Sequence, residues 1–170
     1  MSDDVRALRA AAHPVRLQIL SLLTSTAMSA AEVARELGIT HANASYHLRV
    51  LLDADELVEA GEERIRGGIA KRYRHPWQER SRSHARGGRE LQVRAMVQEL
   101  QRRFAAVDPQ ARMTLSDAEL WVEPEVWERA LLLMVEGAEL IHAQARPPGT
   151  EGTQRVAVTM AAFGMKEADG

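Results

Sequence analysis

A short helical pattern over residues 41–53 gathers side chains that could recognise the edges of nucleic-acid bases. At helical spacing its apolar side is formed by Ala44, Leu48 and Leu51. The opposite side presents small, polar and aromatic groups, namely Ala42, Asn43, Tyr46 and Arg49. An amide can read an adenine edge, and a methyl group or aromatic ring can contact thymine methyls in a major groove.

Hydroxyl and guanidinium groups beside this face can bind phosphate, and we assign that role to Thr40, Ser45 and Arg49. The predicted DNA-contacting set of the helix is therefore Thr40, His41, Ala42, Asn43, Ser45, Tyr46 and Arg49. Taken alone, two short amphipathic helices are equally compatible with a purely core-forming pair.

A basic hairpin follows at once and favours the nucleic-acid interpretation. Residues 57–65 and 69–75 are predicted strands, and Arg66-Gly67-Gly68 supplies the turn. The predicted contacts of this wing are Arg64, Arg66, Lys71, Arg72 and Arg74. Arginines further on, at positions 80, 82, 86 and 89, are better interpreted as a solvated surface.

The elements that hold the recognition face can also be predicted. An amphipathic first helix is expected around residues 5–12, and Pro14 opens a strongly apolar second helix. Ser29 and Glu32 form a capping-box pattern for a third helix that ends at Gly38. Thr40 can cap the fourth helix, which continues to about Asp53.

These stretches (HPVRLQILSLL, SAAEVARELGITHANASYHLRVLLDADELVEA and GGIAKRYR) resemble the winged helix-turn-helix repressors of the ArsR/SmtB family. Residues 45–49, Ser-Tyr-His-Leu-Arg, correspond to the Ser-x-His-Leu-type recognition core of that family. The resemblance covers about residues 5–76. It implies a homodimer on double-stranded DNA that acts as a transcriptional regulator, usually a repressor released by a ligand.

The chain departs from the metal-sensing members of that family. It has no cysteine, and residues 88–106, where a ligand pair would lie, contain no histidine. Its six histidines show no i, i+4 ligand pair, and each is better interpreted as hydrogen-bonded or solvent-exposed. We therefore expect no metal and no cofactor. Without a phosphate-binding glycine loop, a nucleophile elbow or HExxH, we also expect no enzyme.

The second half of the chain is predicted to form a helix over 89–106, a strand over 119–123, a helix from Pro124 to about Arg146 and a strand over 155–160. Apolar side chains on the first of these helices predict a dimerisation surface that includes Leu91, Val97, Leu100 and Phe104. Three further side chains could line an effector pocket, although core or interface packing is favoured for them: Trp121, Trp127 and Met134.

Charge divides the chain into three parts. Net charge is −3 over residues 1–61, +7 over 62–103 and −6 over 104–170. We expect an α+β, mainly α fold with a winged helix-turn-helix domain (1–76), a basic linker (77–88) and a dimerisation or effector region (89–170) containing a helix and a strand-helix-strand unit. Since no signal segment or membrane-spanning run is visible, a cytoplasmic protein is expected. The alternative is a winged-helix protein-interaction module that does not bind DNA.

Overall fold

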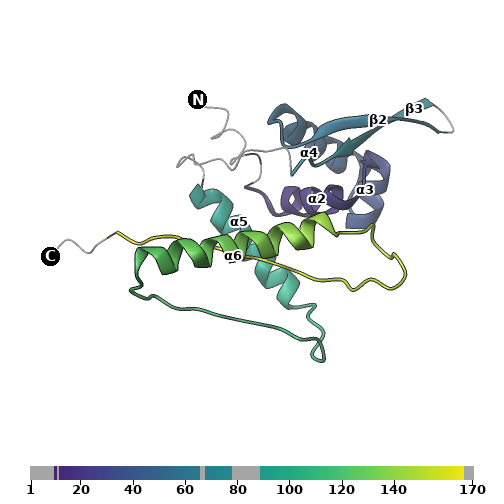
Figure 1. Ribbon diagram of the computed structural model, residues 1–170. Coiled ribbons are helices and arrows are strands. Elements are labelled where there is room, and N and C mark those ends of the chain that lie inside the picture. The colour runs from purple at the N-terminus through teal and green to yellow at the C-terminus, as the bar shows by residue number, and fades with distance from the viewer. Residues whose placement is uncertain (1–9, 11, 66–67, 78–88, 167–170) are drawn as a thin grey trace.

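The computed structural model in Figure 1 describes residues 10, 12–65, 68–77 and 89–166. Its elements are α2 (Pro14–Ser25), β1 (Met28–Ser29), α3 (Ala30–Leu37), α4 (His41–Asp53), β2 (Val58–Ile65), β3 (Gly68–Arg74), α5 (Arg89–Phe104) and α6 (Pro124–Ala143). The α+β, winged-helix class is confirmed, and the predicted bounds of the described helices and of the hairpin are close to the observed ones. The predicted first helix and most of the predicted linker lie outside the described residues.

Helices α2, α3 and α4 enclose the core of the N-terminal half. Its most deeply buried side chains come from all three helices and the start of the hairpin: Ile19, Leu23, Val33, Ala44, Leu48, Leu51 and Leu57. Helix α2 begins where predicted, because proline lacks an amide hydrogen and the first position of a helix does not require one. In addition, His13 Nδ1 accepts a hydrogen bond from the Val15 amide at 3.2 Å.

The turn between α3 and α4 is set by local capping. Ser29 and Glu32 form the predicted capping box, in which the Ser29 amide donates to Glu32 Oε2 at 2.7 Å. Gly38 ends α3 with φ of 64°, a left-handed conformation that glycine adopts without a Cβ clash. Thr40 Oγ1 then accepts from the Asn43 amide at 3.2 Å and starts α4.

The wing is part of a three-stranded antiparallel sheet in the order β1-β3-β2. The two-residue strand β1 was not predicted, because it is too short to show a period. It pairs Met28 with Tyr73 and Ser29 with Arg72, which ties the wing to the start of α3. Beyond this anchor, β2 and β3 extend away from the helices (Figure 1).

Helix α5 attaches to α2 through a buried carboxylate. Glu99 is 2% exposed. It accepts hydrogen bonds from Gln18 Nε2 at 2.6 Å and from Arg102 at 2.9–3.1 Å, and Arg103 Nε lies 3.5 Å away. Burial alone would raise the pKa of Glu99, but the bonds from Arg102 and Gln18 and the charges of Arg102 and Arg103 outweigh it and hold the pKa below its ordinary value.

The strand-helix-strand prediction for the second half is only partly right. Its helix is present as α6, but residues 119–123 and 155–160 are extended without being strands. The physical reason is that a strand needs a hydrogen-bonded neighbour, and neither segment pairs with any described part of the chain. Among the described helices, none combines the length and the apolar character that a membrane crossing requires.

The Glu99 anchor predicts a site-specific loss of stability. Glu99→Gln should lower the free energy of unfolding by about 1–3 kcal/mol, because a charge-assisted set of bonds is replaced by weaker ones. Because the folded-state pKa is depressed, the stabilisation is present above the unfolded value and is lost as pH falls through and below roughly 4.3. Urea denaturation between pH 7 and pH 3.5 measures both effects.

Glu90→Gln is the matched control, since among the described residues Glu90 pairs only with Arg94 on the same helix, and that pair is exposed. It should change stability by less than about 0.5 kcal/mol. Equal effects of the two substitutions would contradict the anchor.

Candidate nucleic-acid interface

Helix α4 presents the side chains predicted to read DNA and buries the opposite stripe. His41, Ala42, Asn43 and Arg49 are exposed, Ser45 is half-buried, and Tyr46 is 59% exposed. Ala44, Leu48 and Leu51 are at most 1% exposed. The division of the helix into an outward and an inward face is confirmed. The DNA contacts assigned to the outward side chains remain predictions.

His47 lies at the edge of the inward side and departs from its sequence interpretation. It is buried, its ring centroid lies 4.8 Å from that of His13, and its Nδ1 has no hydrogen-bond partner among the described residues. Burial, reinforced by His13 and Arg16, holds the pKa of His47 below its ordinary value. Folding therefore favours the neutral ring. Protonation of His47 below about pH 6.5 weakens the packing that holds α4 in place.

Arg72 on the wing, a predicted DNA contact, is engaged inside the chain. Its guanidinium lies 3.1 Å from Glu32 and also pairs with Glu63, and it donates to the Ala27 carbonyl. These bonds link β3, β2 and the start of α3, so they fix the wing against the helix-turn-helix. Lys71 is also paired, to Glu59 at 2.7 Å.

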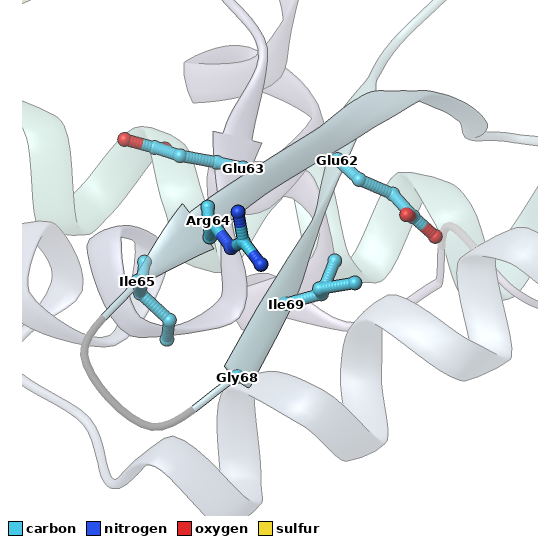
Figure 2. Close-up of a pocket in the computed structure, with 6 residues that line it drawn as sticks. All are labelled: Glu62, Glu63, Arg64, Ile65, Gly68 and Ile69. Atoms are coloured by element: carbon cyan, nitrogen blue, oxygen red, sulfur yellow. The ribbon is translucent and has the colours of Figure 1, made fainter.

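The open end of the wing carries the cation best placed to contact a ligand. Figure 2 shows Arg64, Ile65 and Ile69 around a hollow there, with Glu62 and Glu63 alongside. Arg64 is exposed and has no ion-pair partner among the described residues, whereas Arg74 is half-buried and Arg66 lies outside them. Sequence reasoning missed the exposed Ile65 and Ile69, although their position directly before and after the predicted turn at residues 66–68 could have indicated them.

All but one of the predicted dimerisation side chains lie on one exposed stripe of α5. Val97 is 49% and Leu100 43% exposed, and Val93 and Phe104 share that side at helical spacing. Leu91 is also exposed but lies four residues before Ala95, which is buried on the side that faces α2. Of the four residues predicted for the dimerisation surface, Val97, Leu100 and Phe104 therefore share one side and Leu91 does not, and their part in dimerisation stays a prediction.

The predicted effector pocket is not enclosed by a single chain. Trp121 is 92% exposed, Met134 is exposed, and Trp127 is half-buried at the start of α6. In the part of the chain that the structure describes, no three His, Asp or Glu side chains are grouped as metal ligands. The pocket stays a prediction, as does the expected lack of a metal.

Comparison with known proteins supports the N-terminal part of this interface. A family model described as a helix-turn-helix domain matches residues 11–59, which span α2, β1, α3, α4 and the first residues of β2. No curated protein matches the chain significantly. Together with the fold, the match supports a DNA-binding transcription regulator.

The different surroundings of two wing arginines lead to a testable difference. Arg72→Ala should lower the free energy of unfolding by about 1–3 kcal/mol, because it removes charge-assisted bonds that join three elements. Arg64→Ala, the matched control on the same hairpin, should change it by less than about 0.5 kcal/mol. Urea denaturation at one fixed protein concentration compares them, and a larger loss for Arg64→Ala would refute the structural role of Arg72.

Proposed function

We propose that this chain is a homodimeric transcriptional regulator that binds an inverted-repeat operator and acts as a repressor. The observation that carries the proposal is the two-sided construction of α4. Its inward stripe is completely buried, so the helix cannot turn to hide the outward face formed by Ala42, Asn43, Tyr46 and Arg49. A helix held in this way fits a major groove roughly 12 Å wide.

Within the groove, the outward face divides into base contacts and phosphate contacts. Asn43 would read an adenine edge, and Tyr46 and the Ala42 methyl would contact thymine methyls. Thr40, Ser45 and Arg49 would hold phosphates, with His41 at the entry to the helix. Thr40 serves twice, since its side-chain oxygen also caps α4.

The wing would contribute through its open end. Residues 58–74 contain five basic and three acidic side chains, and the structure pairs Lys71 and Arg72 with glutamates. Arg64 and Arg66 are therefore the better candidates for backbone contact, while Lys71, Arg72 and Arg74 would act mainly through the position of the strand. Each lost phosphate contact should reduce the salt dependence of binding.

Dimerisation would supply selectivity that one short helix lacks. Two recognition helices related by a two-fold axis meet successive major grooves roughly 34 Å apart, which gives an inverted repeat. The exposed Val97 and Leu100 stripe of α5 supports such an assembly, because an apolar stripe of this kind is usually covered in a stable protein.

The repressor role and its release rest on the ArsR/SmtB resemblance. Residues 1–76 would bind DNA, 77–88 would link, and 89–170 would dimerise and could receive a small-molecule effector of unknown identity. Trp121, Trp127 and Met134 would take part in that effector site only if a second chain encloses Trp121, since it is open to solvent in one chain.

One observation favours a second candidate, a winged-helix module that binds protein and not DNA. Most described cations of the wing are engaged within the chain, and its open end exposes Ile65 and Ile69. A gel shift with fragments of the native genome separates the two functions. Absence of any shift at low salt would favour the protein-binding module.

The recognition face is tested by single substitutions. Asn43→Ala and Tyr46→Ala should each weaken binding to the operator by about 1–3 kcal/mol, because each removes a base contact. The unfolding free energy should change little, since both side chains are exposed. Gln98→Ala, an exposed position on α5, is the control. If both α4 variants bind a genome-selected operator like the parent, the proposed reading face is wrong.

The assembly is tested on α5. Replacing Val97 and Leu100 with Asp would bury unpaired charge between subunits, and should yield monomers that have lost specific binding. Gln98→Asp adds a charge outside the stripe and should leave the dimer intact. Light scattering and operator titration measure both properties. A wild-type monomer at micromolar concentration that binds its operator as one chain per site would rule out the dimer.

A further inference from the structure

Two extended segments flank α6 in the sequence and pair with no strand of the described chain, although the Val158 carbonyl accepts a hydrogen bond from Arg103 Nη1 at 3.4 Å. The leading arm comprises residues 115–123, and the trailing arm comprises residues 154–166. Apart from the Glu123 carbonyl, which accepts the first bond of α6, neither arm makes a backbone–backbone hydrogen bond with the described residues. Figure 1 shows both as long open traces, the leading arm below α6 and the trailing arm crossing behind it in this view. An extended chain in this state is a template for strand pairing.

Side chains of the trailing arm alternate as they do in strands with one covered face, whereas the leading arm is apolar on both sides at Leu120, Trp121 and Val122. Leu120 and Val122 share one side of the leading arm. Val156, Val158 and Met160 share one side of the trailing arm, and all five side chains are exposed. The other side of the trailing arm carries Arg155, Ala157 and Thr159. This is the pattern of a strand that packs one face on an apolar layer.

Helix α6, which lies between the arms, also lacks a cover. None of its 20 residues is buried. Trp127, Leu131 and Val135 are half-buried on one side, whereas Val126, Leu133 and Leu140 recur every seven residues on another side and are exposed. An apolar helix flanked in sequence by two strand-like arms is the kind of unit that packs against a second layer of secondary structure. That second layer is missing here.

Charge indicates which arms would meet. The leading arm carries Asp117, Glu119 and Glu123 and no cation, while the trailing arm carries Arg155 and Lys166 and no acidic residue. Pairing two leading arms or two trailing arms would place like charges together. Pairing a leading arm with a trailing arm brings opposite charges together.

We infer that the arms are exchanged in the dimer, so that the leading arm of one copy pairs as a β-strand with the trailing arm of a second copy over the apolar faces of α6. This inference rests on the homodimer of the proposed function and adds a second interface to the α5 stripe. Trp121 would then lie at the junction between subunits, where a second chain can cover it.

Hydrogen exchange on the full chain tests the inference. Amides of residues 119–123 and 155–160 should exchange at least ~10-fold more slowly above the dimer dissociation concentration than below it. Exchange that is fast in a proven dimer would overturn arm pairing and leave the α5 dimer standing. Protection that is equal in monomer and dimer would show pairing within one chain and also overturn the inference. A chain that is monomeric at every concentration would refute the proposed dimer itself.

Substitutions on the trailing arm supply a second measurement. Val158→Asp should raise the dimer dissociation constant at least ~10-fold and abolish the protection, because the charge enters the apolar layer. Ala157→Asn, one residue away on the polar side of the arm, adds a polar group without a negative charge that the acidic leading arm would repel, and should leave both within ~3-fold of the parent. Equal responses of the two variants would contradict the assigned faces.

Discussion

The burial of one stripe of α4 is the constraint on which the rest of the described structure depends. Ala44, Leu48 and Leu51 are almost completely removed from solvent, and they touch the same core as α2 and α3. A 13-residue helix has little stability of its own in water, so this contact both forms the helix and fixes its rotation. The outward face has a defined direction only because the burial of the inward face prevents the helix from rotating about its axis.

Two polar networks extend this constraint to the rest of the chain. Arg72 joins the wing to the first turn of α3, and Glu99 joins α5 to α2 through Gln18. Both networks include α3 or α2, the two helices against which α4 packs. If the chain dimerises through α5 as proposed, a change in the separation of the two α5 helices would be passed to α2 and from there to α4. In the proposed regulator, the same connection would let a ligand bound in the second half of the chain change how α4 meets DNA.

Where local signals are strong, the sequence was enough to predict the structure. The capping box at Ser29, the glycine at 38 and the hairpin at residues 57–75 each specify a geometry within a few residues. The sequence was not enough to predict the structural roles of Arg72 and His47. Their partners lie far away along the chain, at Glu32 and His13, and no spacing rule connects them. The sequence therefore predicts a DNA contact at Arg72 but could not predict its partners inside the chain.

The strand predictions for the second half of the chain failed for a different physical reason. Its alternation over residues 155–160 is a genuine strand pattern, but a pattern specifies a face and not a neighbour. In one chain the neighbour is missing, so the same residues stay extended and the helix between the arms stays uncovered. If the neighbour is a second copy, the strand prediction describes the assembly correctly and the isolated chain incorrectly. The operator, with its two half-sites, and the arms would then depend on the same two-fold axis.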